Sequence, residues 1–345
     1  MTTLRPRTIV ELTELLRSRP GVLRIRGSGS RQDRLPATPT GAHELDCSGL
    51  DAIERLDAPD QTCTVGVGVP REALDEALRP HRLELPCLGG GTLGGLFASD
   101  AIGPASVGAA SPRTLLLGME AMLADGTVFQ SGARVVKSVA GFDVHKLLVG
   151  SRGTLFCATR LHLRLKPMPR ASAWFRAEQL DLAPALERFV ALRSLAVPPA
   201  QLHLQRTTAG TSLTGRIAGR ATFVIATLRA HDLNEAPAQS PLHLTAPAGG
   251  EVLSGVVLPS RVVELLAAVP SDAKFLLHGG GRFELALATP LATDRVLASL
   301  PRLGAHACIV AGDSARRGNG TPLDPGQQRL AAGLKQALDP HGIFV

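Results

Sequence analysis

The sequence has no tyrosine, one tryptophan and ten phenylalanines, so aromatic residues make up only 3% of its 345 residues. Its hydrophobic cores must therefore be built mainly from leucine, valine and alanine. The arginines are scattered, and no basic run is interleaved with aromatic residues as in nucleic-acid-binding segments. We therefore expect no nucleic-acid partner, and the formal net charge of +7 suits an anionic ligand or an acidic partner protein.

Paired cysteines and long hydrophobic runs are absent as well. None of the five cysteines forms a CxxC motif or a cluster with histidine, which argues against a zinc ribbon, an iron–sulfur cluster or another metal site. The sequence begins without the apolar core of a signal peptide, and no apolar run approaches the roughly 20 residues of a membrane span. The expected location is therefore the cytoplasm, with no membrane span.

The length of the chain predicts two domains, because single hydrophobic cores stop growing at about 250–300 residues. Pro167 and Pro169 mark the expected boundary, with one domain over residues 1–168 and a second over residues 169–345. The second half alternates between predicted helices and strands, which favours an antiparallel α+β cap. The predicted helices cover residues 184–195, 260–268 and the stretch after Asp324, where Leu330, Leu334 and Leu338 face inward; the predicted strands cover residues 201–206, 221–228 and 283–288.

A loop of glycine and serine follows a predicted strand near the start of the sequence. Residues 22–26 alternate as a short strand and lead directly into Gly27-Ser-Gly-Ser30. Successive N–H groups and hydroxyls in such a loop can surround phosphate oxygens, although any hairpin could carry the same residues. The loop is not a dinucleotide-binding GxGxxG motif, because Gln32 occupies the place of the third glycine.

A second glycine cluster places five glycines in seven residues, from Gly89 to Gly95. So few side chains favour a backbone that lies against a ligand over a packed core. Leu93, Leu96 and Phe97 supply an apolar stripe that could anchor the cluster, which argues against the alternative of an unanchored loop.

Residues 131–166 are predicted to form a short helix, a glycine turn and a long strand. Asp143 begins the helix, and Gly150 and Gly153 bracket the turn. From Leu155 to Lys166 the pattern has period two, as in a strand with one buried face. The turn could present backbone N–H groups to a polar ligand, or it could simply end the helix.

Residues 132–155, GARVVKSVAGFDVHKLLVGSRGTL, resemble the VKNVAGYDL…GSEGTLG segment of FAD-linked oxidases with a flavin domain of the vanillyl-alcohol-oxidase (PCMH) type. Within that superfamily the chain is most similar to the E subunits of bacterial glycolate oxidases, strongly over its first half and weakly over its second. The resemblance implies an α+β fold in which a two-lobed, PCMH-type FAD-binding domain is followed by an antiparallel α+β cap. Two residues depart from the family pattern: Arg152 replaces an acidic residue and Phe156 replaces a glycine.

The resemblance also implies that FAD binds, and that it binds non-covalently. The loop from Gly27 to Ser30 corresponds to the family's phosphate loop, and it lacks the histidine that bonds covalently to the flavin in some relatives. Asp100 follows the second glycine cluster, so it should repel the phosphates unless Arg113 or Lys137 pairs with it. The residues implied to bind FAD are Arg26, Gly27, Ser28, Gly29, Ser30, Arg31, Thr92, Leu93, Gly94, Gly95, Ser99, Gly103, Gly153, Thr154, Cys157 and Ala158.

Flavin chemistry on a 2-hydroxy acid needs a base for the hydroxyl group and a cation for the carboxylate, while the flavin accepts the hydride. His278, Arg282 and His306 are weak candidates for these roles, because a histidine beside glycines is a turn residue about as often. We therefore expect that the chain itself contributes little or no substrate chemistry.

The implied function is the FAD-binding subunit of a multi-subunit glycolate or other 2-hydroxy-acid oxidase. The implied partners are a catalytic D-type flavin subunit and an iron–sulfur F-type subunit, which pass electrons toward the membrane quinone pool. Any association with the inner face of the plasma membrane would then run through these partners. Two alternatives stay open: a self-sufficient FAD oxidoreductase for another small acid or alcohol, and a non-catalytic scaffold that has lost the cofactor.

Overall fold

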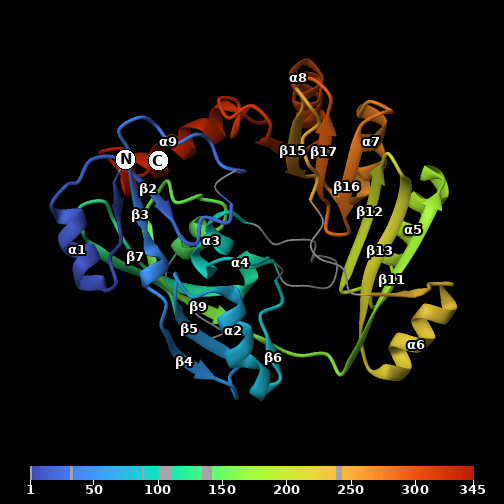
Figure 1. Ribbon diagram of the computed structural model, residues 1–345, viewed down its shortest axis with the longest axis horizontal. Helices are drawn as coiled ribbons and strands as arrows, with labels where there is room; N and C mark the ends of the chain where they lie inside the picture. Colours follow the sequence, from blue (N-terminus) through green and yellow to red (C-terminus); the bar gives the residue numbers. More distant parts are fainter. Residues whose placement is uncertain (1, 32–33, 88, 101–110, 134–141, 238–242) are drawn as a thin grey trace.

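The computed structural model describes residues 2–31, 34–87, 89–100, 111–133, 142–237 and 243–345. Two large hydrophobic cores lie within these ranges. The first gathers residues from the N-terminal half together with three near the end of the sequence, and the second lies between residues 171 and 309. Figure 1 shows the two corresponding bodies side by side, and we refer to them as the N-terminal domain and the cap. On the position of these cores we propose a boundary near residue 168.

The N-terminal domain contains two sheets, which form two lobes. A three-stranded parallel sheet has the order β1-β3-β2, and a five-stranded antiparallel sheet has the order β4-β5-β9-β7-β8. The strands are β1 Thr3–Leu4, β2 Leu23–Arg26, β3 His43–Asp46, β4 Ile53–Asp57, β5 Thr62–Gly66, β7 Leu116–Met122, β8 Val128–Gly132 and β9 Cys157–Arg164, with β6 Leu83–Glu84 and β10 Lys166–Pro167 as a separate pair. The helices are α1 Ile9–Arg17, α2 Arg71–Leu78, α3 Leu93–Ala98 and α4 Pro112–Leu115, with the 3-10 turns η2 Cys47–Gly49, η3 Arg79–His81 and η4 Val144–Leu148.

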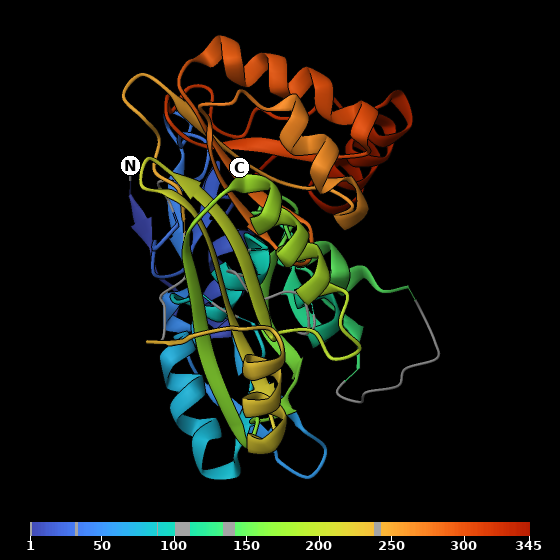
Figure 2. The same cartoon turned by 90° about the vertical axis from the view of Figure 1, so that its right-hand side faces the viewer.

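The cap is built on one eight-stranded antiparallel sheet with the order β14-β11-β13-β12-β16-β17-β15-β18. Its strands are β11 Ala171–Leu180, β12 Gln201–Thr207, β13 Gly210–Gly219, β14 Glu235–Ala236, β15 Glu251–Val256, β16 Lys274–His278, β17 Arg282–Leu287 and β18 His306–Ala311. Its helices are α5 Leu182–Arg193, α6 Ala221–Ala230, α7 Val262–Ala268 and α8 Pro290–Ser299, with the 3-10 turns η5 Pro259–Arg261 and η6 Leu300–Leu303. Helices α5 and α6 lie on the side of the sheet that faces away from the N-terminal domain (Figures 1 and 2).

Strand β9 shows the alternation that the sequence predicts. Cys157, Leu161 and Leu163 are completely buried in the first core. Because β9 lies between β5 and β7 in the middle of its sheet, its second face is covered too, and His162 is buried with its Nδ1 3.0 Å from the hydroxyl of Thr64. The sequence predicted only one buried face, because it does not reveal which strand is central.

Residues 221–228 form helix α6, so the predicted strand is wrong there. The run contains β-branched residues, which favour strands, but Val224 and Thr227 are buried while Ile225 is 49% exposed. A spacing of three residues between buried positions is that of a helix with one face on a sheet. Packing against the cap sheet therefore outweighs the preference of these β-branched residues for a strand.

The last helix, α9 (Pro325–Leu338), begins as predicted. The Asp324 carboxylate accepts hydrogen bonds from the N–H groups of Gly326 and Gln327, and the Gln327 side chain accepts one from the Asp324 N–H. Leu338 packs against the first core, but Leu330 is 65% exposed, which contradicts its predicted inward position. Within the described ranges, no helix has both the length and the apolarity needed to cross a lipid bilayer.

Candidate functional site

The predicted phosphate loop directly follows β2 and rests on the second glycine cluster. A Cβ atom on Gly27 would lie 1.9 Å from Oγ1 of Thr92, so only glycine permits this contact. Gly29 has a φ of +78°, and the hydroxyls of Ser28 and Ser30 lie 3.5 Å apart. Among the described residues, none accepts a hydrogen bond from the backbone N–H of Ser28, Gly29 or Ser30. These N–H groups are therefore available to an anion.

At the centre of the second glycine cluster, the backbone of Leu93 and Gly94 packs against other parts of the protein. Gly94 donates its N–H to the Val67 carbonyl at 2.8 Å, and a Cβ on Gly94 would lie 2.7 Å from the Val67 Cβ. Leu93 donates its N–H to the Val69 carbonyl at 2.9 Å, and its side chain is completely buried. The backbone of Leu93 and Gly94 thus packs on the chain beyond β5, and their N–H groups are already used.

Gly95 faces the space between the two loops. The nearest atoms to a Cβ at this position would be Oγ1 of Thr92 at 3.2 Å and Nη1 of Arg31 at 3.9 Å. A Cβ at this position would therefore be tight only against the Thr92 hydroxyl and at van der Waals distance from the loop cation, whereas a Cβ on Gly94 would clash with Val67.

The glycine turn before β9 forms a third wall. Arg152 and Gly153 have φ values of +55° and +77°, and a Cβ on Gly153 would lie 3.1 Å from the Cβ of Ile25. The turn therefore lies directly against β2. Phe156, where the resemblance predicted a glycine, is buried and packs edge-on against Phe129 with the ring centroids 5.5 Å apart. The helix predicted before this turn is the 3-10 turn η4.

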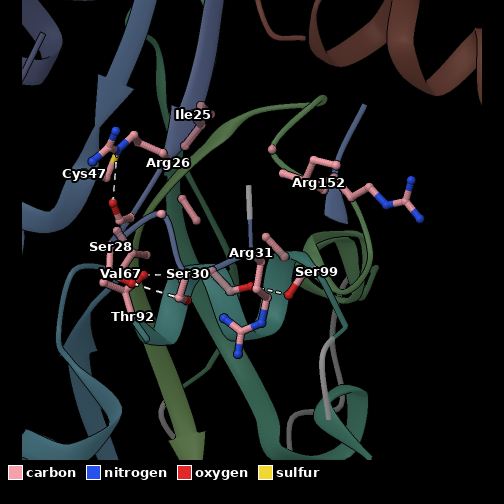
Figure 3. A pocket seen from close by; sticks show the side chains of 18 of the residues that line it. Ile25, Arg26, Ser28, Ser30, Arg31, Cys47, Val67, Thr92, Ser99 and Arg152 are labelled. Carbon is pink, nitrogen blue, oxygen red and sulfur yellow. Dashed lines mark hydrogen bonds between the residues drawn. The ribbon is translucent and has the colours of Figure 1, made fainter. Parts of the chain in front are cut away.

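The three walls surround a pocket with about 740 Å³ of empty space, including its open mouth. Figure 3 shows Ser28, Ser30 and Thr92 gathered together, and Arg152 directed away from them. The predicted residues that line the pocket are Arg26, Gly27, Ser28, Gly29, Ser30, Arg31, Thr92, Gly94, Gly95, Ser99, Gly153 and Ala158.

Further lining residues were not assigned to the site from the sequence. They are mostly apolar: Ile25, Leu35, Cys47, Val67, Ala98, Leu148, Arg152 and Phe156. Ile25 precedes the phosphate loop by two residues, so strand alternation could have placed it in this wall. Of the remaining predicted residues, Leu93, Thr154 and Cys157 are absent from the lining, and Gly103 lies outside the described residues.

Cys157 lies behind the pocket wall rather than in it. Its Sγ is 3.6 Å from the Sγ of Cys47, which does line the pocket, and both side chains are buried. The hydrogen bond with Cys157 and burial together raise the pKa of the Cys47 thiol. Cys47 therefore contributes a neutral surface to the pocket.

The pocket is electropositive because two of the three arginines that line it, Arg31 and Arg152, have no carboxylate partner among the described residues. Arg26 pairs with Glu44 at 2.9 Å, and Arg34 pairs with Glu284 of the cap at 2.6 Å. Arg31 has no carboxylate partner among the described residues, and burial together with the charge of Arg34 lowers its pKa. An opposite charge within about 4–6 Å would offset both effects. The site therefore suits a phosphate group beside Arg31.

Asp100 pairs with the cap and not with the residues predicted for it. Its carboxylate accepts a hydrogen bond from the Arg282 guanidinium, whereas Arg113 donates to the Val149 carbonyl at 3.3 Å. Lys137, the other predicted partner, lies outside the described residues. The charge of Asp100 is thus offset at the junction between the two domains.

The three catalytic candidates occupy three strands of the cap sheet, β16, β17 and β18, of which β16 and β17 are neighbours. His278 is buried, and its Nδ1 lies 2.9 Å from the Nδ1 of His203. Arg282 and His306 both pair with Val256 in β15, so a strand separates them. His306 is exposed, whereas Arg282 reaches the N-terminal domain. No cluster of three or more histidine, cysteine, aspartate or glutamate residues suited to a metal occurs in the described part of the chain.

Residues 3–132 match the sequence model of the family described as "FAD binding domain". This span includes both loops of the pocket. The chain contains an FAD-binding domain. The expected fold, a two-lobed PCMH-type FAD-binding domain followed by an antiparallel α+β cap, is confirmed, and FAD is its cofactor.

Relatives of the FAD-binding domain extend the comparison to the cap. Glycolate oxidase subunit GlcE of Escherichia coli K12 is 28% identical over 92% of this chain and 89% of its own length. The D-lactate dehydrogenase of Archaeoglobus fulgidus is 36% identical, but the match covers 33% of this chain and only 27% of that protein. The solved structure of an alkyldihydroxyacetonephosphate synthase superposes over 99% of this chain and 75% of its own, with a TM-score of 0.69 and 14% identity. That last likeness concerns the fold alone.

Proposed function

We propose that this protein is an FAD-dependent oxidoreductase acting on CH–OH donors, with a small 2-hydroxy acid as the substrate of the complex to which it belongs. The observation that carries the proposal is the pocket, whose lining combines the free N–H groups of the phosphate loop with the Arg31 guanidinium, which has no carboxylate partner among the described residues. The relatives named as glycolate oxidase and D-lactate dehydrogenase support the substrate class.

The pocket residues fit FAD in their chemistry. Ser28, Gly29 and Ser30 would hold the diphosphate with their N–H groups, and Arg31 would supply the counter-charge. Ile25, Val67 and the other apolar residues of the lining suit the uncharged parts of the cofactor. When bound, the flavin accepts the hydride from the substrate carbon. The loop carries no histidine that could bond to it, so we propose dissociable FAD.

We further propose that the chain is the FAD-binding subunit of a glycolate oxidase complex and works with a catalytic D-type flavin subunit and an iron–sulfur F-type subunit. The similarity to GlcE over nearly the whole of both chains supports this assignment. The excess of basic residues would favour docking onto acidic partner surfaces. Any association with a membrane would then be peripheral and would depend on these partners.

A second candidate, a self-sufficient oxidoreductase, is favoured by one feature. The buried pair of His203 and His278 and the Arg282 guanidinium lie on the cap near the junction with the FAD-binding domain. Such groups could act on a hydroxy acid without a partner subunit.

Dye reduction by the purified chain distinguishes these candidates. With FAD and glycolate, the isolated chain is expected to reduce an artificial electron acceptor negligibly, because it lacks an assigned base and an internal electron relay. Activity should appear when the D-type and F-type subunits are added. Robust turnover by the chain alone, at a rate that the partners leave unchanged, would contradict the subunit assignment and favour the self-sufficient enzyme.

A further inference from the structure

The residues after α9 return to the FAD-binding domain and extend its three-stranded sheet. Leu23 of β2 donates its N–H to the Ile343 carbonyl at 2.7 Å, and Val345 donates its N–H to the Leu23 carbonyl at 3.0 Å. Phe344 pairs in parallel with Leu23 and is buried in the first core. The segment is therefore fixed to the strand that leads into the phosphate loop.

A buried carboxylate holds this segment in shape. The side chain of Asp339 is 0% exposed. It accepts hydrogen bonds from the N–H of Ile343 at 2.9 Å, from the N–H of Phe344 at 2.8 Å and from Nζ of Lys335 at 2.7 Å. A buried carboxylate is stable in its charged form only with such partners.

The Lys335 ammonium uses all three of its donors in this arrangement. Besides Asp339, its Nζ donates to the Phe344 carbonyl and to the Thr154 carbonyl, each at 2.7 Å. Thr154 closes the glycine turn whose Gly153 lines the pocket and lies against Ile25 of β2. One ammonium thus joins two walls of the pocket, the turn before β9 and the segment paired with β2.

We infer that Lys335, held by Asp339, is a positioning residue of the cofactor site, which fixes the glycine turn against the strand that carries the phosphate loop. Lys335 is distant from the loop in sequence and is not among the pocket-lining residues, so its effect on the cofactor runs through the backbone of Thr154 and β2. The inference rests on FAD occupying the pocket, as proposed above. The competing explanation is that the cluster only stabilises the fold.

The test compares Lys335→Met with Leu338→Ala in the full chain. Methionine keeps the length of the side chain but has no donor, whereas Leu338 lies on the same helix, packs on the first core and has no hydrogen bond with the turn. We expect Lys335→Met to accelerate amide hydrogen exchange in residues 151–155 of the protein without added cofactor, and to raise the dissociation constant for FAD about 10-fold. Leu338→Ala should leave both quantities close to those of the wild type, even where it lowers the melting temperature.

Equal effects of the two substitutions, or unchanged exchange in residues 151–155 of Lys335→Met, would overturn the inference. If Lys335→Met does not fold, Asp339→Asn provides the same test, because it removes the charge that holds the ammonium and should produce the same local pattern. Failure of the wild type to bind FAD would count against the proposed function, whereas the exchange data decide the role of Lys335 in the turn independently.

Discussion

Replacing Gly95 with valine is expected to abolish FAD binding at micromolar concentrations while leaving the fold intact. The added Cβ would have only Thr92 and Arg31 as neighbours within 4 Å, and the branched methyl groups would extend into the space between the two loops. Overpacking typically costs about 1–3 kcal/mol, and a cost of this size in the free energy of FAD binding corresponds to a loss of affinity between about 5-fold and 150-fold. Titration of the cofactor-free protein with FAD, followed by flavin fluorescence, measures the loss.

Gly94→Ala is the matched control for that substitution. Its Cβ would lie 2.7 Å from the Cβ of Val67, so the strain falls on the packing of the glycine cluster against the chain beyond β5. We expect this variant to lower the melting temperature of the cofactor-free protein, which Gly95→Val should leave nearly unchanged. Stoichiometric FAD binding by Gly95→Val would show that Gly95 does not face the cofactor.

Acidification from pH 7 to pH 5 is expected to destabilise the protein through the buried pair of His203 and His278. Burial lowers the pKa of His203 to about 3, and burial together with the neighbouring His203 lowers that of His278 well below its ordinary value. Glu284, Arg282 and His243 also face His278 and contribute smaller effects of both signs. Below about pH 6.5 the unfolded chain binds protons that the folded protein does not, so the free energy of unfolding falls as the pH falls, until the pH reaches the folded pKa.

His203→Gln isolates this contribution. Each such histidine lowers the free energy of unfolding by about 1.4 kcal/mol for every pH unit below 6.5. Between pH 7 and pH 5 the variant should therefore lose about 2 kcal/mol less of its free energy of unfolding than the wild type does. Urea unfolding at the two pH values measures the difference. His306→Gln is the control, because His306 is exposed and its removal should leave the difference unchanged. Equal pH dependence in all three proteins would show that His203 titrates normally in the folded state.

Local patterns in the sequence were sufficient for the elements that hold the phosphate loop. Alternation predicted β2 and β9, and the absence of side chains at Gly27 and Gly94 indicated close contacts of the backbone. A Cβ at Gly27 or Gly94 would meet Thr92 or Val67, and both glycines also line the pocket. A glycine cluster thus reveals that something approaches the chain, but not what approaches it.

Contacts between distant residues escaped prediction. Arg282 pairs with Asp100 across 182 positions, and Lys335 reaches Thr154 across 181. Such pairs follow from the way the cap and α9 pack on the FAD-binding domain, and no local periodicity encodes them. Helix α6 was missed for a related reason, because the face that it buries is chosen by the cap sheet and not by its own β-branched residues.

The visible spectrum of the purified protein, recorded before and after acid precipitation, tests the central claim that this chain binds dissociable FAD. The account predicts flavin absorption bands at about one FAD per chain after incubation with FAD and removal of the excess, and release of all the flavin into the supernatant after precipitation. Flavin retained on the precipitated chain would contradict its non-covalent binding. The absence of flavin from both fractions would contradict binding itself.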